Sequence, residues 1–187
     1  MTPDTIGRRA FIFHGYGATP QDHWFGWLAG RLERAGVRTE VPALPESASP
    51  APDAWAAAVA KAVGTPDEKS VVVAHSLGCL AVLRHLASLS GPWRLGHLLL
   101  VSGFVDTLPA LPVLDGFIAG GVDTAGVREK IGSLTLLRSD DDRFVPTGHT
   151  DRLADLLGTT AAVVPGAGHF LADDGVTSLP QALEAIV

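Results

Sequence analysis

The chain has 187 residues, 47% of them hydrophobic and 18% charged, and a formal net charge of −6 at pH 7. This composition excludes an intrinsically disordered chain, and the length suits one well-buried core rather than two ordinary domains. The acidic balance argues against nucleic acid as a partner, because a phosphate-binding face needs clustered Lys and Arg, which the sequence lacks. A single domain spanning residues 1–187 is therefore expected.

Short apolar segments alternate along the chain with longer amphipathic ones, a pattern typical of a parallel sheet with helices on both faces. Six strands are expected, at residues 10–13, 38–41, 70–74, 97–101, 134–138 and 161–164. Five helices are expected, at residues 21–35, 52–63, 77–89, 147–157 and 179–187. Because crossovers between parallel strands are right-handed, these helices should cover both faces of one α/β sheet.

The residues before the first expected strand include Arg8 and Arg9, which loosely resemble a twin-arginine export signal. The apolar stretch behind them ends after residue 13 and is shorter than the apolar region of such a signal. The single cysteine, Cys79, cannot form an internal disulfide, so nothing in the sequence requires an oxidising compartment. Since no apolar run approaches the roughly 18 residues of a membrane span, a cytoplasmic protein without a membrane segment is expected.

The most informative segment is residues 71–80, where a β-branched apolar strand breaks at Ser76 and an apolar helix follows. A serine on so tight a strand-to-helix turn needs small residues two positions before and after it, because two backbones approach closely there. Ala74 and Gly78 meet this need. The segment predicts a nucleophile elbow, which holds the Ser76 hydroxyl clear of its own backbone. A serine that only caps the following helix is the alternative interpretation.

Two further polar segments follow the last two expected strands. Residues 138–146 contain three consecutive aspartates, and residues 163–170 contain His169 in a glycine-rich turn. Open α/β sheets place their sites at the carboxyl ends of their strands, where both segments lie. The chain order Ser76, aspartate, His169 is that of the α/β-hydrolases and differs from the orders of chymotrypsin and subtilisin.

Asp142 is the expected acid of this set, because Val145-Pro146 follows it in the arrangement that places the acid in many α/β-hydrolases. Asp141 is expected to bind backbone groups in its own turn and Asp140 to be solvated, which are common roles of loop aspartates. Asp106, after the fourth expected strand, is a less favoured alternative acid.

This set of residues suits nucleophilic catalysis. A neutral serine is a poor nucleophile, so His169 must take the Ser76 proton, and a carboxylate must hold the imidazole in the right tautomer. The oxyanion that forms needs two preorganised donors. The Leu77 N–H supplies one at the elbow, and the Tyr16 N–H is expected to supply the other from a loop that its flanking glycines allow to curl toward the serine.

Several blocks together carry a family resemblance: residues 14–16, 23–28, 74–78, 100–104, 141–142, 145–146 and 168–171. They resemble the small α/β-hydrolases of the serine hydrolase family, which include retinoblastoma-binding protein nine and, more similar to this chain, bacterial YdeN. The resemblance extends from about residue 11 to the C-terminus. It implies a reduced α/β-hydrolase fold, a triad of Ser76, Asp142 and His169, and esterase-like or peptidase-like hydrolysis of small substrates. Ala74 departs from the glycine found at its position in many α/β-hydrolases.

Other residues near these motifs have two interpretations. His23 and Trp24 could line the substrate pocket, or they could pack the first helix on the sheet. His75 is expected to point to the opposite side of its strand and to pack there, and His14 to hold its loop by hydrogen bonds. Residues 104–132 are strongly apolar and could roof a hydrophobic acyl pocket, or could form an ordinary crossover helix.

These features predict a cytoplasmic serine hydrolase that cleaves a small ester, thioester or amide through an acyl-enzyme, with a small-molecule substrate and no cofactor. No metal site is expected, since His85, His97 and His149 lack ligand spacing. A protein partner is not indicated by the sequence. Two alternatives stay open: an acyltransferase that uses the same triad and excludes water, and a non-catalytic interaction scaffold, which would have no need of a triad and oxyanion donors.

Overall fold

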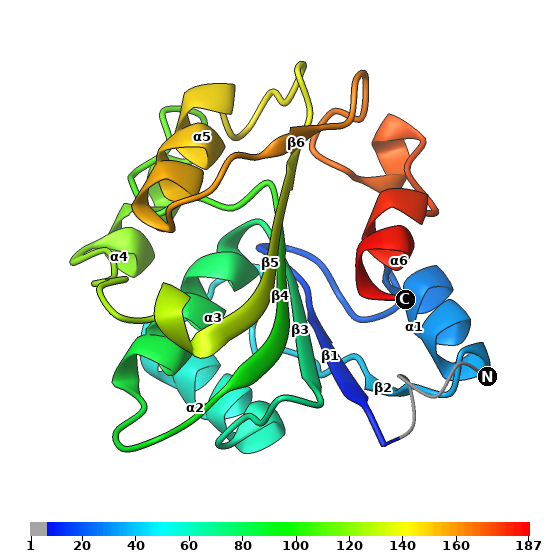
Figure 1. The fold of residues 1–187 in the computed structure, drawn as a ribbon. Coiled ribbons are helices and arrows are strands. Elements are labelled where there is room, and N and C mark those ends of the chain that lie inside the picture. Colours follow the sequence, from blue (N-terminus) through cyan, green and yellow to red (C-terminus); the bar gives the residue numbers. More distant parts are fainter. Residues whose placement is uncertain (1–6) are drawn as a thin grey trace.

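In a computed structural model, residues 7–187 are described and form a parallel sheet of six strands (Figure 1). The strands are β1 (Arg9–Phe13), β2 (Arg38–Glu40), β3 (Ser70–His75), β4 (Leu95–Val101), β5 (Ile131–Arg138) and β6 (Ala162–Val163). They lie in the order β2-β1-β3-β4-β5-β6, and every neighbouring pair is parallel. The predicted α/β class and six-stranded parallel sheet are confirmed.

Helices cover both faces of the sheet, as the sequence predicts (Figure 1). On one face lie α1 (Phe25–Arg34) and α6 (Pro180–Ile186), which are drawn in blue and red. On the other lie α2 (Pro52–Val63), α3 (Leu77–Ser88), the short α4 (Asp115–Ile118) and α5 (Thr147–Leu156). No helix within residues 7–187 has the length and apolar character needed to cross a bilayer.

The core consists of two apolar clusters, one on each face of the sheet. Successive side chains of a strand point to opposite faces, so each central strand contributes to both clusters. In β1, for example, Phe11 and Phe13 join the cluster beneath α2 and α3, whereas Ala10 and Ile12 join the cluster beneath α1 and α6. The central strands are therefore buried on both sides, which explains their continuous apolar sequences.

Local sequence signals set the ends of several helices. Pro52 occupies the first turn of α2, where its missing N–H costs nothing, and Gly64 follows the last turn with φ +58°. The expected helix at residues 21–35 begins only at Phe25. The Asp22 carboxylate accepts hydrogen bonds from the Thr19 N–H and hydroxyl, and His23 has φ +55°, so residues 19–24 form a turn instead.

Residues 104–132 do not form the long crossover helix that was one of the two expectations. They contain α4 and two single 3₁₀ turns, at Pro112–Leu114 and Arg128–Lys130. Leu108, Leu114 and Phe117 are buried in the cluster beneath α2 and α3, so much of the segment packs as core. Leu111 from the same segment lines a cavity described below.

The strand order positions the loops that matter for function. Ser76 follows β3, Asp142 follows β5 and His169 follows β6, so all three lie at the edge formed by the carboxyl ends of the strands. The loop after β1 reaches the same edge and contains Gly15 and Tyr16. Such an edge is where ligands bind in open α/β sheets.

Candidate active site

Ser76 occupies a strained turn between β3 and α3. Its backbone has φ 55° and ψ −125°, a conformation that a residue with a side chain rarely adopts, and its N–H donates to the Val101 carbonyl at 2.9 Å. The neighbouring loop passes so close that a Cβ added at Gly15 would lie 2.9 Å from Ser76 Cβ. At Gly78, an added Cβ would collide with the backbone carbonyl of His14. Gly78, the second small residue of the motif, is thus required by the approach of these two segments.

The Ser76 hydroxyl begins a chain of hydrogen bonds through three side chains. Its Oγ lies 2.9 Å from His169 Nε2, and His169 Nδ1 lies 2.7 Å from Asp142 Oδ2. The other carboxylate oxygen of Asp142 accepts the backbone N–H groups of Phe144 and Val145, each at 2.9 Å. With Nδ1 donating to a carboxylate, Nε2 of a neutral His169 is free to accept the serine proton.

The environment of Asp142 keeps its carboxyl group ionised at neutral pH. Burial of the carboxyl would raise its pKa, but the hydrogen bond and positive charge offered by His169, with the N–H groups of Val145 and Phe144, outweigh burial and lower the pKa. The side chains of His169 and Asp142 are 7% and 3% exposed, so this pair is shielded from water.

Leu77 adjoins Ser76 and Tyr16 adjoins Gly15, and each has a backbone N–H. Leu77 begins α3, and in residues 7–187 neither its N–H nor that of Tyr16 donates to a protein acceptor. His14 holds the second loop as expected: its Nε2 accepts the Leu44 N–H at 2.9 Å, so its protonated Nδ1 donates to the Gly15 carbonyl at 2.9 Å. Burial lowers the pKa of His14, which favours this neutral form.

The three consecutive aspartates all bind the turn that contains His169. Asp140 Oδ1 accepts the Gly166 N–H and Asp141 Oδ1 accepts the Gly168 N–H, both at 2.8 Å, while Asp142 binds the imidazole. Asp140 is exposed, as expected of a solvated side chain, and in addition its carboxylate accepts a backbone N–H from the histidine turn. Asp141 does bind backbone, but in this facing turn rather than in its own.

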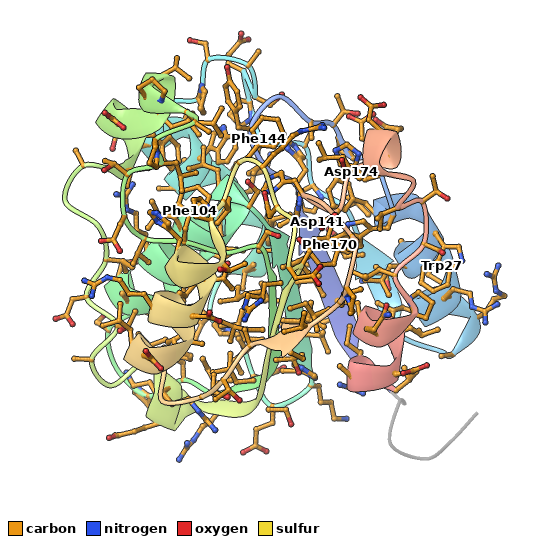
Figure 2. All side chains as sticks on the ribbon, turned by 90° about the horizontal axis from the view of Figure 1, so that it is seen from above. Trp27, Phe104, Asp141, Phe144, Phe170 and Asp174 are labelled. Carbon is orange, nitrogen blue, oxygen red and sulfur yellow. The ribbon has the colours of Figure 1, made fainter. Side chains whose placement is uncertain are left out.

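A fourth carboxylate, Asp174, was not singled out from the sequence. Its Oδ2 accepts the N–H of His169 at 2.8 Å and that of Leu171 at 3.2 Å, and its Oδ1 lies 3.6 Å from Arg143 Nη2. Figure 2 shows Asp174, Asp141 and Phe170 gathered in the same region. The sequence offers little to find Asp174, because an aspartate five residues after a histidine carries no signal without the turn that brings them together.

His75 does more than the packing expected of it. Its Nε2 donates to the His169 carbonyl at 2.8 Å, and the centres of the two imidazole rings are 4.9 Å apart. Burial, and then the nearby charge of His169, lower the pKa of His75 well below its usual value, so it stays neutral. The difference arises because the turn that contains His169 lies against the end of β3, where the His169 carbonyl meets His75.

His23 and Trp24 have different environments. His23 lines the cavity next to Ser76, and its Nδ1 accepts the Ala172 N–H at 3.0 Å. Trp24 is fully buried in the cluster beneath α1 and α6, and does not line that cavity. The packing interpretation thus fits Trp24. Trp27, which Figure 2 shows at the outer side of the molecule, packs at the edge of the same cluster.

Asp106, the alternative acid, is directed elsewhere. Its Oδ2 accepts a hydrogen bond of 2.6 Å from Arg152 Nε in a solvent-exposed ion pair. His85 and His97 bond to the Gly64 carbonyl and the Thr135 hydroxyl. Within residues 7–187 there is no group of three or more His, Cys, Asp or Glu side chains arranged to hold a metal ion.

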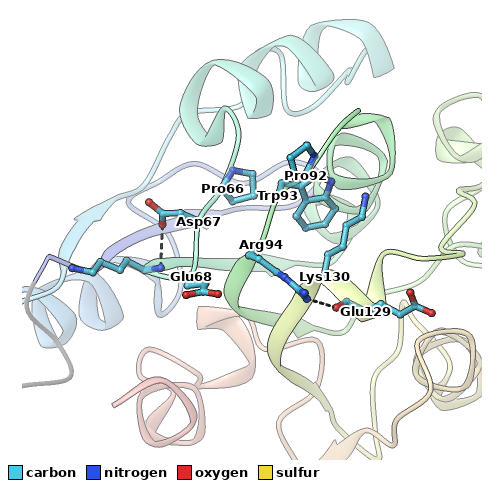
Figure 3. Close-up of a pocket in the computed structure, with 9 residues that line it drawn as sticks. Pro66, Asp67, Glu68, Pro92, Trp93, Arg94, Glu129 and Lys130 are labelled. Carbon is cyan, nitrogen blue, oxygen red and sulfur yellow. Dashed lines mark hydrogen bonds between the residues drawn. The ribbon is translucent and has the colours of Figure 1, made fainter.

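A cavity of about 160 Å³ opens beside Ser76 and His169. A larger one, about 690 Å³, lies at the opposite edge of the sheet (Figure 3). Its lining residues 66–69, 92–94 and 129–130 immediately precede β3, β4 and β5, so it is separated from Ser76 by the length of the strands. We therefore assign the candidate site to the smaller cavity, which contains the strained serine.

The parallel sheet and the sharp turn at Ser76 together define an α/β-hydrolase fold. Residues 10–186 match the family described as serine hydrolase, and the chain belongs to this family. It is 38% identical over 173 residues to YdeN of Bacillus subtilis (strain 168), a protein to which a hydrolase function has been attributed, with 92% of this chain and 91% of YdeN covered.

Solved structures agree with this fold. The crystal structure of the Bacillus subtilis YdeN product superposes with a TM-score of 0.90 at 37% identity, covering 95% of each chain. A YdeN-like protein from Pectobacterium atrosepticum gives a TM-score of 0.67 at 15% identity, covering 95% of this chain and 88% of the other, and supports the fold alone.

Proposed function

We propose that this protein hydrolyses a small ester, thioester or amide through an acyl-enzyme formed on Ser76. The observation that carries the proposal is the hydrogen-bonded chain from Ser76 Oγ through His169 to Asp142, with links of 2.9 and 2.7 Å. Membership of the serine hydrolase family agrees with it. Ser76 is the proposed nucleophile, His169 the base and acid, and Asp142 the group that orients the imidazole.

In the first half-reaction, Ser76 Oγ bonds to the substrate carbonyl carbon while His169 Nε2 takes the hydroxyl proton. The carbonyl oxygen becomes an oxyanion, for which the N–H groups of Tyr16 and Leu77 are the proposed donors. When the intermediate collapses, the bond to the leaving group breaks, and the imidazolium of His169 gives its proton to that group. Ser76 then holds the acyl group as an ester.

In the second half-reaction, water replaces the leaving group. His169 takes a proton from the water as its oxygen attacks the acyl carbon, and returns that proton to Ser76 Oγ as the acid is released. Asp142 stays ionised throughout and stabilises the imidazolium in both steps. The reaction uses only groups of this chain and water, so the proposal includes no metal or cofactor.

A serine-directed fluorophosphonate probe tests the proposal. Ser76→Ala should abolish both probe labelling and ester hydrolysis, because no other hydroxyl within residues 7–187 is hydrogen-bonded to the His169 ring. Ser102→Ala is the matched control, since Ser102 also follows a strand, is buried and has a positive φ of 47°, but its Oγ has no partner in the described structure. Labelling that persists in Ser76→Ala, or disappears in Ser102→Ala, would contradict the assignment.

The same experiment separates the alternatives. A non-catalytic scaffold would show no labelling that depends on Ser76. An acyltransferase would be labelled but would release free acid only slowly, and adding an acceptor would yield the acylated acceptor in place of the acid. We also propose a single domain over residues 1–187, a cytoplasmic location and a small-molecule substrate. Nucleic acid is not a proposed partner, in keeping with the net charge of −6.

A further inference from the structure

The cavity at Ser76 has an apolar wall built from distant parts of the chain. Tyr16 and Ala18 come from the loop after β1, Leu111 from residues 104–132, and Phe144 and Leu171 from the loops that follow Asp142 and His169. These side chains surround the hydroxyl that is the proposed nucleophile. A substrate group placed there would contact mainly hydrocarbon.

The cavity offers no charged partner to a substrate. Among the described residues that line it there is no Asp, Glu, Lys or Arg, and its ionisable side chains are Tyr16 and three histidines. Burial lowers the pKa values of His23 and His75, so both are neutral at pH 7. Two carboxylates beside His169 are already engaged: Asp142 binds its imidazole, and Asp174 binds two backbone N–H groups and Arg143.

The volume limits what can enter. The cavity measures about 160 Å³. Pockets for drug-sized ligands are larger, roughly 300–1,000 Å³. The leaving group departs after the first half-reaction, whereas the acyl group stays on Ser76 through the second. The acyl group is therefore the part of the substrate that the cavity must hold.

We propose that this cavity selects a short, uncharged acyl group, and that Leu111 sets the upper limit of its length. The proposal rests on the proposed acyl-enzyme at Ser76. Leu111 is the only lining residue contributed by residues 104–132, and it is partly exposed, so its side chain forms a wall without being part of the central core.

A set of ethyl esters tests the size and charge of the acyl group in one assay, by titration of the released acid. Ethyl butyrate should be hydrolysed with a kcat/KM about tenfold or more above that of ethyl octanoate. β-Alanine ethyl ester has nearly the shape of ethyl butyrate but carries an ammonium group, and monoethyl succinate carries a carboxylate. Both should be slower by about 100-fold, because the cavity pairs neither charge.

Variants of Leu111 test its role. Leu111→Ala should raise the octanoate-to-butyrate ratio of kcat/KM about tenfold, and Leu111→Phe should lower the rate for butyrate relative to acetate. Val113→Ala is the matched control, since Val113 lies two residues away, is 68% exposed and does not line the cavity. It should leave all ratios unchanged. Thermal unfolding of each variant checks that the fold is retained.

The possible outcomes are distinct. Equal rates for the charged and neutral esters, faster hydrolysis of octanoate, or Leu111 variants with unchanged ratios would overturn the inference while leaving Ser76 as nucleophile. The inference would also be overturned if the rate depended on the chain length of the alcohol part and not on that of the acyl part. Ethyl and hexyl acetate test this. Failure to hydrolyse any ester, together with no labelling of Ser76, would refute the proposed function itself.

Discussion

Asp142 differs from its two neighbours in what its carboxylate binds. Its Oδ2 accepts from the His169 imidazole, whereas Asp140 and Asp141 accept only from backbone N–H groups of the same turn. An asparagine at 142 would present an NH₂ group to Nδ1 and hold the imidazole in the tautomer that cannot accept the serine proton. Asp142→Asn should therefore lower kcat on the order of 10⁴-fold, the loss known for this change in the best-studied triad.

Asp140→Asn and Asp141→Asn are the controls for this measurement. An asparagine side chain keeps a carbonyl oxygen that can accept from Gly166 or Gly168, although a neutral acceptor forms a weaker bond than a carboxylate. Asp140→Asn should cost little, and Asp141→Asn an intermediate amount, because Gly168 adjoins His169. A near-normal Asp142→Asn enzyme beside an inactive Asp141→Asn enzyme would show that Asp141, and not Asp142, is the acid that orients His169.

At this scale, the sequence is informative where chemistry depends on local spacing. The turn around Ser76 needs small residues at fixed distances, and its geometry could be predicted from them. The contacts of Asp174 and His75 with His169 could not be predicted, because both depend on how the turn after β6 folds over the end of β3. The burial of Trp24 away from the cavity could not be predicted either, because it depends on how the start of α1 packs on the sheet.

Among the elements, the first turn of α3 makes the tightest contact at the site. A Cβ at Gly78 would overlap the His14 carbonyl oxygen and lie 3.2 Å from that of Phe13, and both are backbone atoms that cannot rotate away. Gly78→Ala should therefore displace the loop that contains Tyr16, lowering kcat by about 100-fold if one oxyanion donor is lost. It should also destabilise the fold by about 1–3 kcal/mol through overpacking.

Gly26→Ala provides the control for a glycine in a helix. Gly26 lies in α1, and an added Cβ would meet no atom within 4 Å. This change should leave kcat unchanged and stabilise the protein by about 0.4–1 kcal/mol, since alanine restricts the unfolded chain. Steady-state kinetics and urea unfolding of both variants check the prediction, which fails if Gly78→Ala retains full activity.

The elements themselves were predictable to different degrees for identifiable reasons. The helix expected at residues 52–63 is found with those bounds, because Pro52 and Gly64 mark its two ends. Residues 104–132 gave no unique prediction, since apolar residues such as Leu108 and Leu114 suit a core helix and a cavity roof equally well. Whether the segment forms a helix or a roof depends on how it packs against the cluster beneath α2 and α3. Most of the other residues of that cluster are distant from the segment in sequence.

At the scale of the whole molecule, several buried histidines link stability to pH. Burial lowers the pKa values of His14, His75, His85 and His97, so the folded protein resists protonating them. Below pH 6.5 the unfolded chain binds these protons and the folded protein does not, so the free energy of unfolding decreases as the pH falls. Asp142 adds to this loss of stability at lower pH. Its ionised carboxylate stabilises the folded protein, and because its pKa is lowered from 3.8, this stabilisation is lost only as the pH falls below 3.8.

His97 allows this link to be measured at one residue. It lies on β4 with its Nε2 3.0 Å from the Thr135 hydroxyl, and burial, with the charge of Arg8, lowers its pKa to about 4. Between pH 7 and pH 4 this single histidine should cost the folded state about 3 kcal/mol. His97→Gln can still hydrogen-bond Thr135 but does not titrate, so urea unfolding at pH 7, 6, 5 and 4 should show a smaller decline for the variant. If the free energy of unfolding declined in parallel for the two proteins, His97 would be protonated at the same pH in the folded and the unfolded chain. Other groups would then cause the acid sensitivity.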